Sequence, residues 1–208
     1  SPHANAFGKT YGEWAAAWWQ WAFALPADDT HPTNANGDVD CSLGQEGKVW
    51  FLAGATGNWP DGEVSAERTC EEPIPVGKAL FFPIVNLVCT DLGGDGQTGE
   101  DLLACANFIA DFNYPVSVTI DGAPVDNLED YLVVSPPFTF ETSTDPPVLY
   151  GFPPDTEGIG ATSGYYLLLP PLSAGAHDIE FSGGVLAPDF GVDWELHVLY
   201  HFTVGKNK

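Results

Sequence analysis

Three polar residues in the C-terminal segment 194–204 could do chemistry together. Glu195, His197 and His201 alternate with apolar residues, so a β-strand would place all three side chains on one face. Histidines four residues apart on a strand lie about 13 Å apart, too far to bind one metal ion, although either could pair with a neighbouring carboxylate. A hydrolase with a carboxylate or metal-bound site on this face is therefore one hypothesis.

Two acidic segments, 28–40 and 91–101, carry the hard oxygen ligands that calcium prefers. Neither follows the full spacing of an EF-hand loop, and a solvated loop is the simpler interpretation of each. Calcium is nevertheless the one cofactor that the sequence suggests. The candidate ligands are Asp28, Asp29, Asn34, Asn36, Asp38, Asp40, Asp91, Asp95, Glu100 and Asp101.

Aromatic residues outside the apolar runs are candidates for ligand contacts. Trp59, in Asn58-Trp59-Pro60-Asp61, is the best exposed ring, although packing within a loop is the alternative. With Tyr165 and Tyr166 it could form a platform for a carbohydrate. No G-x-S-x-G elbow, phosphate loop or dinucleotide motif is present, which favours a non-catalytic protein without deciding the question.

Composition restricts the partners. The 208 residues include six basic and 29 acidic side chains, for a formal net charge of −23. Such a charge disfavours nucleic acid, because phosphate binding depends on Lys and Arg. No apolar run reaches the roughly 20 residues that span a bilayer, so we expect no membrane insertion.

The four cysteines, at positions 41, 70, 89 and 105, form no C-x-x-C pair, which favours disulfides over a metal site. Three pairings are possible. We favour Cys41–Cys70 and Cys89–Cys105, since each closes a loop-rich stretch. The chain begins at Ser1 and has no methionine, so we expect a secreted, extracellular or periplasmic protein whose signal peptide has been removed.

The elements that must position these residues begin with a tryptophan-rich helix over 11–25. Thr10 and Glu13 have the spacing of a capping box, and Pro26 ends the helix. Its apolar arc is so wide that the helix must be buried deeply, in its own domain or against another subunit. The arc includes Tyr11, Trp14, Trp18, Trp21 and Leu25.

The remaining pattern is mainly β. A second helix is expected at 99–112, and residues 27–47 and the stretch between 53 and 78 are expected to be loops. Short strands are expected at 48–53, 78–85, 116–120, 131–134, 138–141, 148–152, 165–169, 178–181 and 194–204. With 18 prolines and 23 glycines, this indicates an N-terminal arm (1–10) and a single β-sandwich or jelly-roll-like domain (11–208).

The chain resembles an uncharacterised family of secreted bacterial proteins. The similar stretches are 11–26 (YGEW…WWQW), 41–54 (GQEGKVWFLAG), 68–70 with 77–86 (GKALFFPIVN), 164–177 and the closing strand. The resemblance implies secretion and a β-sandwich fold, and it implies no activity.

Together these observations predict a secreted, non-catalytic structural or interaction protein. Its partner would be itself, in a filament-like assembly stabilised by disulfides and calcium, or an extracellular polymer. The arm and the closing strand are the expected contacts, through helix docking or strand addition. The alternatives are a carbohydrate-binding module and the hydrolase.

Overall fold

The tryptophan-rich segment forms helix α1 (Tyr11–Ala24) in the computed structural model, which describes residues 5–112 and 114–206. The capping box is confirmed: Thr10 Oγ1 accepts a hydrogen bond from the Glu13 amide, and Glu13 Oε2 accepts one from the Thr10 amide. The helix ends before Pro26, as expected.

Helix α1 is buried against its own chain. Trp18 and Trp19 are 2% and 3% exposed. Their indole N–H groups reach partners far along the chain, since Trp18 donates to Leu52 O and Trp19 to Thr162 Oγ1, at 2.8 and 2.9 Å. The width of the apolar arc is therefore explained without a second subunit.

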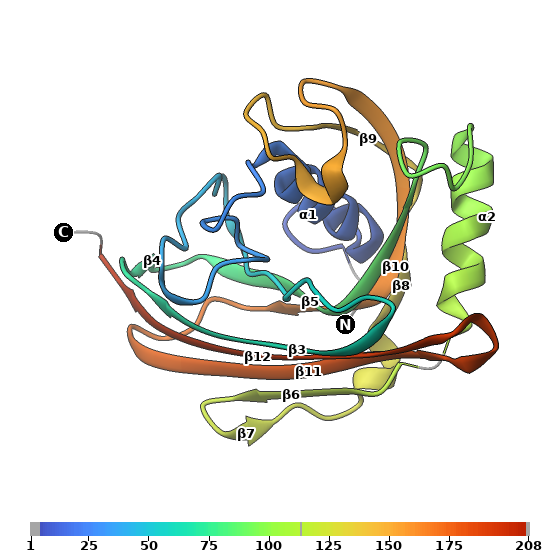
Figure 1. Ribbon diagram of the computed structural model, residues 1–208. Helices are drawn as coiled ribbons and strands as arrows, with labels where there is room; N and C mark the ends of the chain where they lie inside the picture. Colours follow the sequence, from blue (N-terminus) through green and yellow to red (C-terminus); the bar gives the residue numbers. More distant parts are fainter. Residues whose placement is uncertain (1–4, 113, 207–208) are drawn as a thin grey trace.

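Two sheets make up the rest of the architecture, and α1 covers one face of the smaller sheet (Figure 1). The smaller sheet has the order β2-β5-β10-β8, with β9 also paired to β10. Its strands are β2 (Val49–Phe51), β5 (Ala79–Thr90), β8 (Leu132–Val134), β9 (Phe138–Glu141) and β10 (Glu157–Leu169).

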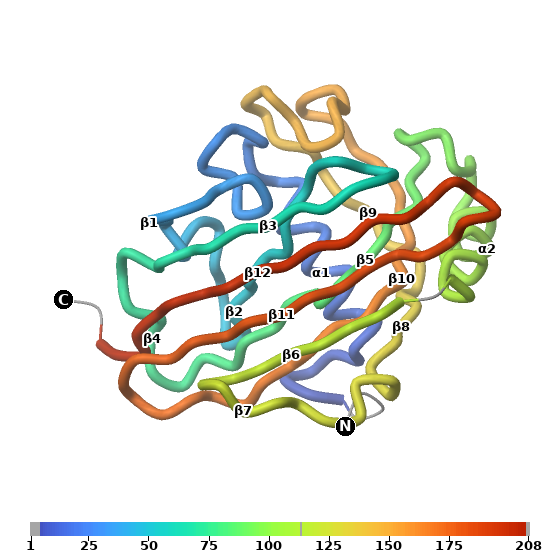
Figure 2. The backbone as a smooth tube through the Cα atoms, turned by 60° about the horizontal axis from the view of Figure 1, so that its bottom comes forward, coloured from blue at the N-terminus to red at the C-terminus, as the bar shows by residue number. Residues whose placement is uncertain are grey.

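The larger sheet has the order β1-β3-β12-β11-β6-β7, with β4 also paired to β12, and its strands cross the view of Figure 2. Its strands are β1 (Gly37–Val39), β3 (Asp61–Cys70), β4 (Ile74–Pro75), β6 (Val116–Ile120), β7 (Ala123–Pro124), β11 (Gly175–Ala187) and β12 (Val192–Gly205). The main core lies between the two sheets.

Helix α2 (Gly99–Ala110) packs on the part of β5 and β10 that the larger sheet leaves uncovered. The described residues also form three short 3₁₀ helices: η1 (Leu128–Tyr131), η2 (Leu149–Gly151) and η3 (Pro188–Phe190). The expectation of a mainly β, sandwich-like fold with an N-terminal helix and one further helix is thus confirmed. No helix of the described residues is long and apolar enough to cross a membrane.

Two glycines make room for a bulge in β5, where the register against β10 shifts between Tyr165 and Tyr166: Gly164 lies on β10 in the same sheet, and Gly183 lies on β11 in the facing sheet. A Cβ at Gly164 would lie 2.4 Å from Val85 O, and one at Gly183 would lie 2.7 Å from Ile84 O. Only glycine fits at these contacts.

Three secondary-structure predictions are wrong. Residues 61–70 form strand β3 rather than part of a loop, because its inward side chains are small or polar and carry little hydrophobic signal. The stretch 27–47 contains β1. Residues 148–152, predicted as a strand, hold η2, which interrupts extended structure with Tyr150 at a positive φ of 59°.

Both favoured disulfides are present. Cys41–Cys70 joins the segment after β1 to the end of β3, and Cys89–Cys105 joins β5 to α2. The Trp14 indole donates to Ala6 O and so fixes the described part of the arm to α1. Residues 1–4 of the predicted arm lie outside the described residues.

Candidate ligand-binding cleft

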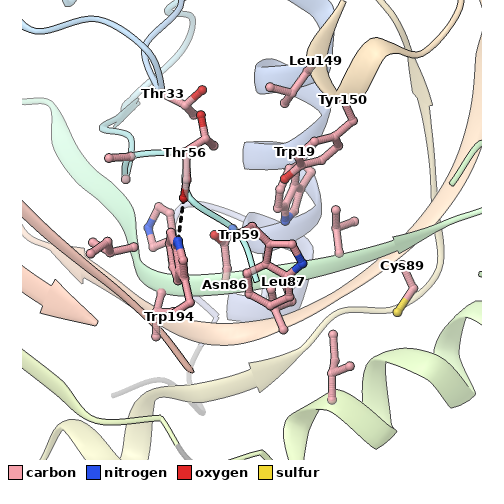
Figure 3. A pocket seen from close by; sticks show the side chains of 18 of the residues that line it. Trp19, Thr33, Thr56, Trp59, Asn86, Leu87, Cys89, Leu149, Tyr150 and Trp194 are labelled. Atoms are coloured by element: carbon pink, nitrogen blue, oxygen red, sulfur yellow. Dashed lines mark hydrogen bonds between the residues drawn. The ribbon is translucent and has the colours of Figure 1, made fainter. Parts of the chain in front are cut away.

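A cleft of about 610 Å³ opens where the chain leaves β5 uncovered, and we call it the aromatic cleft. Residues 83–89 of β5 line it, together with the loop 54–59, Trp194 of β12, and the α1 side of the fold, where Trp19 and Tyr150 lie (Figure 3). Its volume is that of a typical small-molecule site, about 300–1,000 Å³.

The loop 54–59 forms one wall and is held by β12. Trp194 Nε1 donates to Gly57 O at 2.6 Å, and the ring of Trp59 stands edge-on to that of Trp194, with centroids 5.9 Å apart. Trp59 remains 50% exposed. A large aromatic ring held by a rigid partner and left open to solvent is a typical ligand contact.

Arg68, the only arginine, positions the start of the same loop from inside the protein. It is 1% exposed, and its guanidinium donates to Ala53 O and Gly54 O at 2.8 and 3.0 Å. A third donation goes to Ala35 O. A planar guanidinium directs several N–H groups at fixed angles, so one side chain can donate to three backbone carbonyls at once. These carbonyl dipoles stabilise the buried cation.

The opposite wall is aromatic as well. The rings of Trp19 and Tyr150 lie 6.1 Å apart, and Tyr150 is 55% exposed. Tyr150 is not among the residues that the sequence pattern predicts for a site, because the pattern around it predicts a strand. The signal that could have identified it is its position among four prolines, at 146, 147, 153 and 154, which disfavour regular strand pairing.

A buried network supports the floor of the cleft. Asn86 Nδ2 donates to Tyr166 Oη at 2.9 Å, and that hydroxyl lies 2.9 Å from Thr162 Oγ1. Burial raises the pKa of Tyr166 to about 12, so the phenol stays protonated. Asn86 stands out in the sequence as a polar residue inside the apolar run of β5.

The lining of the aromatic cleft carries few titratable side chains. Among the described residues that line the cleft, Asp95 supplies the one carboxylate, and Cys89 and Cys105 are joined to each other. Asp95 Oδ2 accepts the amide of Thr90 at 2.9 Å.

The structure separates the three rings of the predicted carbohydrate platform. Trp59 lies in the aromatic cleft, whereas Tyr166 is fully buried beneath α1 and stacks on Phe81 with centroids 5.4 Å apart. Tyr165 points to the other face of β10, where its ring lies 5.9 Å from that of Tyr114. Adjacent strand residues alternate between faces, so the two tyrosines cannot share a surface.

In the first acidic segment (28–40), side-chain oxygens of several candidate ligands accept hydrogen bonds from the protein itself. Asp28 Oδ1 accepts from Thr30, and Asp40 Oδ1 accepts from Ser42. Asn34 Oδ1 accepts from Thr56, and Asn36 Oδ1 accepts the amide of Glu67. These contacts tie the segment to the cleft loop and to β3. Asp29 and Asp38 are exposed in the same segment.

The second acidic segment is similarly engaged. Asp91 Oδ1 accepts the amide of Ile159, and Asp101 caps α2 through Thr98. Glu100 lies in the first turn of α2. Within the described residues no group of three or more His, Cys, Asp or Glu side chains converges as a metal site would require. Calcium binding stays a prediction.

The histidine face lies on the outside of the larger sheet. His201 Nδ1 lies 2.7 Å from Asp178 Oδ1, and His197 Nε2 lies 2.8 Å from Glu180 Oε1. The hydrogen bond to Asp178 raises the pKa of His201. Glu195 and His197 line a second, shallower depression of about 510 Å³, which His201 does not enter. The predicted trio is therefore only partly brought together.

Comparisons with known proteins add little. No family model matches the chain, and no curated protein matches it. A solved structure described as "Structure of PbICP-C in complex with falcipain-2" is similar over 76% of this chain and 100% of that chain, at 13% sequence identity and a TM-score of 0.26. A similarity at that level supports no conclusion about fold or function.

Proposed function

We propose that this protein is a non-catalytic binding protein whose ligand occupies the aromatic cleft. The observation that carries the proposal is the half-exposed ring of Trp59, held against Trp194 at the edge of a cavity of about 610 Å³. Exposed aromatic rings beside an apolar cavity, with few polar groups, are the usual form of a ligand site.

The lining supports binding of an amphipathic ligand. Apolar side chains would provide most of the affinity, at roughly 25 cal/mol for each Å² removed from water. Asn86 and Asp95 would orient the ligand through hydrogen bonds. Secretion agrees with the two disulfides, which are typical of oxidising compartments, and forms part of the proposal.

Self-assembly stays a prediction with less support than the sequence suggested. The tryptophans of α1 pack within one chain, and the larger sheet ends in the short strands β1 and β7. Short edge strands offer little backbone for pairing with a second copy. A carbohydrate ligand remains a second candidate, since Trp59 offers one flat ring for a sugar.

The test is calorimetric titration of oligosaccharide and peptide libraries against the wild-type protein, Trp59→Ala and Phe7→Ala. Phe7 is 46% exposed and does not line the aromatic cleft, so it controls for the loss of any exposed ring. The proposal expects a ligand that binds wild type and Phe7→Ala alike and binds Trp59→Ala at least about tenfold more weakly. Equal affinity for all three proteins would refute it.

A further inference from the structure

We infer that the ligand of the aromatic cleft is an extended peptide segment of another protein, which adds as a strand to the uncovered edge of β5. This inference rests on the proposed function, because it names the occupant of the same cleft. It is drawn from the backbone of β5 rather than from the exposed rings.

The edge of β5 is uncovered where it lines the cleft. Strand β2 pairs with β5 only at positions 79–81, and the last contact is the Leu52 amide donating to Phe81 O. After Leu52 the chain departs to form the loop 54–59, which makes the far wall. Among the described residues no strand lies beside positions 83–89 on this side.

The pairing with β10 identifies the backbone groups that face the cleft. The amide of Thr162 donates to Ser135 Oγ and its carbonyl accepts from the Ser135 amide, so the Thr162 backbone faces away from β5. Alternation along antiparallel strands then turns the N–H and C=O of Val88, opposite Thr162, away from β10. Asn86, opposite Gly164, is turned the same way.

The same alternation is visible at the end of the edge. Thr90 also faces away from β10, and its amide and carbonyl bond with Asp95 at 2.9 and 3.0 Å. Asn86 and Val88 have no such partner among the described residues. Their N–H and C=O groups therefore present donors and acceptors two residues apart, as an added strand requires.

The walls of the cleft match the side chains of an added strand. On the α1 side of the smaller sheet lie Trp19 and Tyr150, and on the other side lie Ile109 and Phe112. Because successive side chains of an extended peptide point to opposite faces, both sets would find apolar contacts. The favoured peptide carries apolar residues at consecutive positions, like a central strand.

The negative charge of the protein favours a peptide that carries a basic residue. The protein carries a formal net charge of −23, and Asp95 places a carboxylate at the end of the uncovered edge. A basic residue flanking the apolar positions would meet that carboxylate, and a basic peptide would associate faster with so acidic a surface. A carbohydrate would instead need more hydroxyl-binding side chains than the cleft provides.

The experiment selects random octapeptides displayed on phage for binding to the wild-type protein. The affinity of the best peptide, made synthetically, is then measured for the wild type, Val88→Pro and Val88→Thr. Val88→Pro removes the outward N–H that the fold does not use, and proline is tolerated on such an edge. Val88→Thr keeps that N–H and a similar shape, and serves as the control. Thermal unfolding verifies that both variants are folded.

Strand addition predicts that Val88→Pro binds the peptide at least about tenfold more weakly than Val88→Thr, because the two variants differ at the same position in whether the outward N–H is present. At ten times Kd the peptide should slow hydrogen exchange of the Asn86 and Val88 amides about tenfold. N-methylation of the peptide should abolish binding at alternate positions only. This last readout does not depend on any protein variant.

Two results would overturn the inference and leave the proposed function standing. One is a peptide that needs Trp59 but tolerates Val88→Pro and every N-methylation. The other is a library that yields no peptide while an oligosaccharide binds in a Trp59-dependent way. Absence of any Trp59-dependent ligand would instead refute the proposed function itself.

Discussion

Arg68 Nη1 donates a hydrogen bond to the phenolic oxygen of Tyr200, 2.8 Å away, and the guanidinium carbon lies 5.2 Å from the centre of the Tyr200 ring. Tyr200 Oη in turn accepts the amide of Ala53 and donates to Ala53 O. A buried cation thus holds the first residues of the cleft loop through a network of neutral partners.

Replacement of Arg68 should be among the most destabilising single changes. Arg68→Met would leave the carbonyls of Ala35 and Gly54 without a donor, and that of Ala53 with the Tyr200 hydroxyl alone. We expect a loss of about 3 kcal/mol in the free energy of unfolding. Denaturant unfolding measures it. Lys48→Met, at an exposed cation, is the control and should change the stability by less than about 0.5 kcal/mol. Equal effects would contradict the assigned role of Arg68.

Gly183 should not tolerate a side chain. A Cβ there would lie 2.6 Å from Val85 Cβ and 2.7 Å from Ile84 O, so Gly183→Ala should cost about 1–3 kcal/mol or more of unfolding free energy. Gly205→Ala is the matched strand control, because its nearest neighbour would be 3.6 Å away. A small loss of stability at both positions would show that the β5 bulge does not lie as close to Gly183 of β11 as described.

His31 should make stability depend on pH. It is 1% exposed; its Nδ1 accepts the Thr33 amide, which leaves Nε2–H to donate to Ala22 O near the end of α1. Burial lowers the pKa of His31 below its ordinary 6.5, so the unfolded chain binds a proton more readily than the folded one. Its contribution to stability is therefore full above pH 6.5 and falls as the pH drops below that value.

We expect wild type to lose more stability than His31→Gln between pH 6.5 and 5. The raised pKa values of His177 and His201 act in the opposite direction, chiefly above pH 6.5, and cancel in the comparison because both proteins retain them. Chemical denaturation across this range measures the difference. Parallel stability curves for the two proteins would show that His31 does not stay neutral in the fold.

Sequence reasoning succeeded where a pattern was local and strong. The capping box at Thr10, the strand 116–120 and the favoured disulfides needed only short-range spacing or loop closure. It failed at β3, whose partner β12 lies more than a hundred residues away and supplies much of its pairing. It also treated Arg68 as a loop residue, since a buried cation gives no apolar signal.

The site illustrates the same limit. Trp59 could be selected because it stands alone in a polar stretch, whereas Trp194, Tyr150 and the edge of β5 meet it only through tertiary structure. Tyr165 and Tyr166 were grouped by adjacency, yet adjacency on a strand separates side chains onto opposite faces.

The most direct measurement is the ¹H–¹⁵N spectrum of the seven tryptophan indoles during titration with the tightest ligand from the oligosaccharide and peptide screens. Trp59 and Trp194 line the aromatic cleft, whereas Trp14 and Trp50 do not. The account predicts shifts of the first two resonances and none of the second two. Shifts at Trp14 or Trp50 without a change at Trp59 would contradict it.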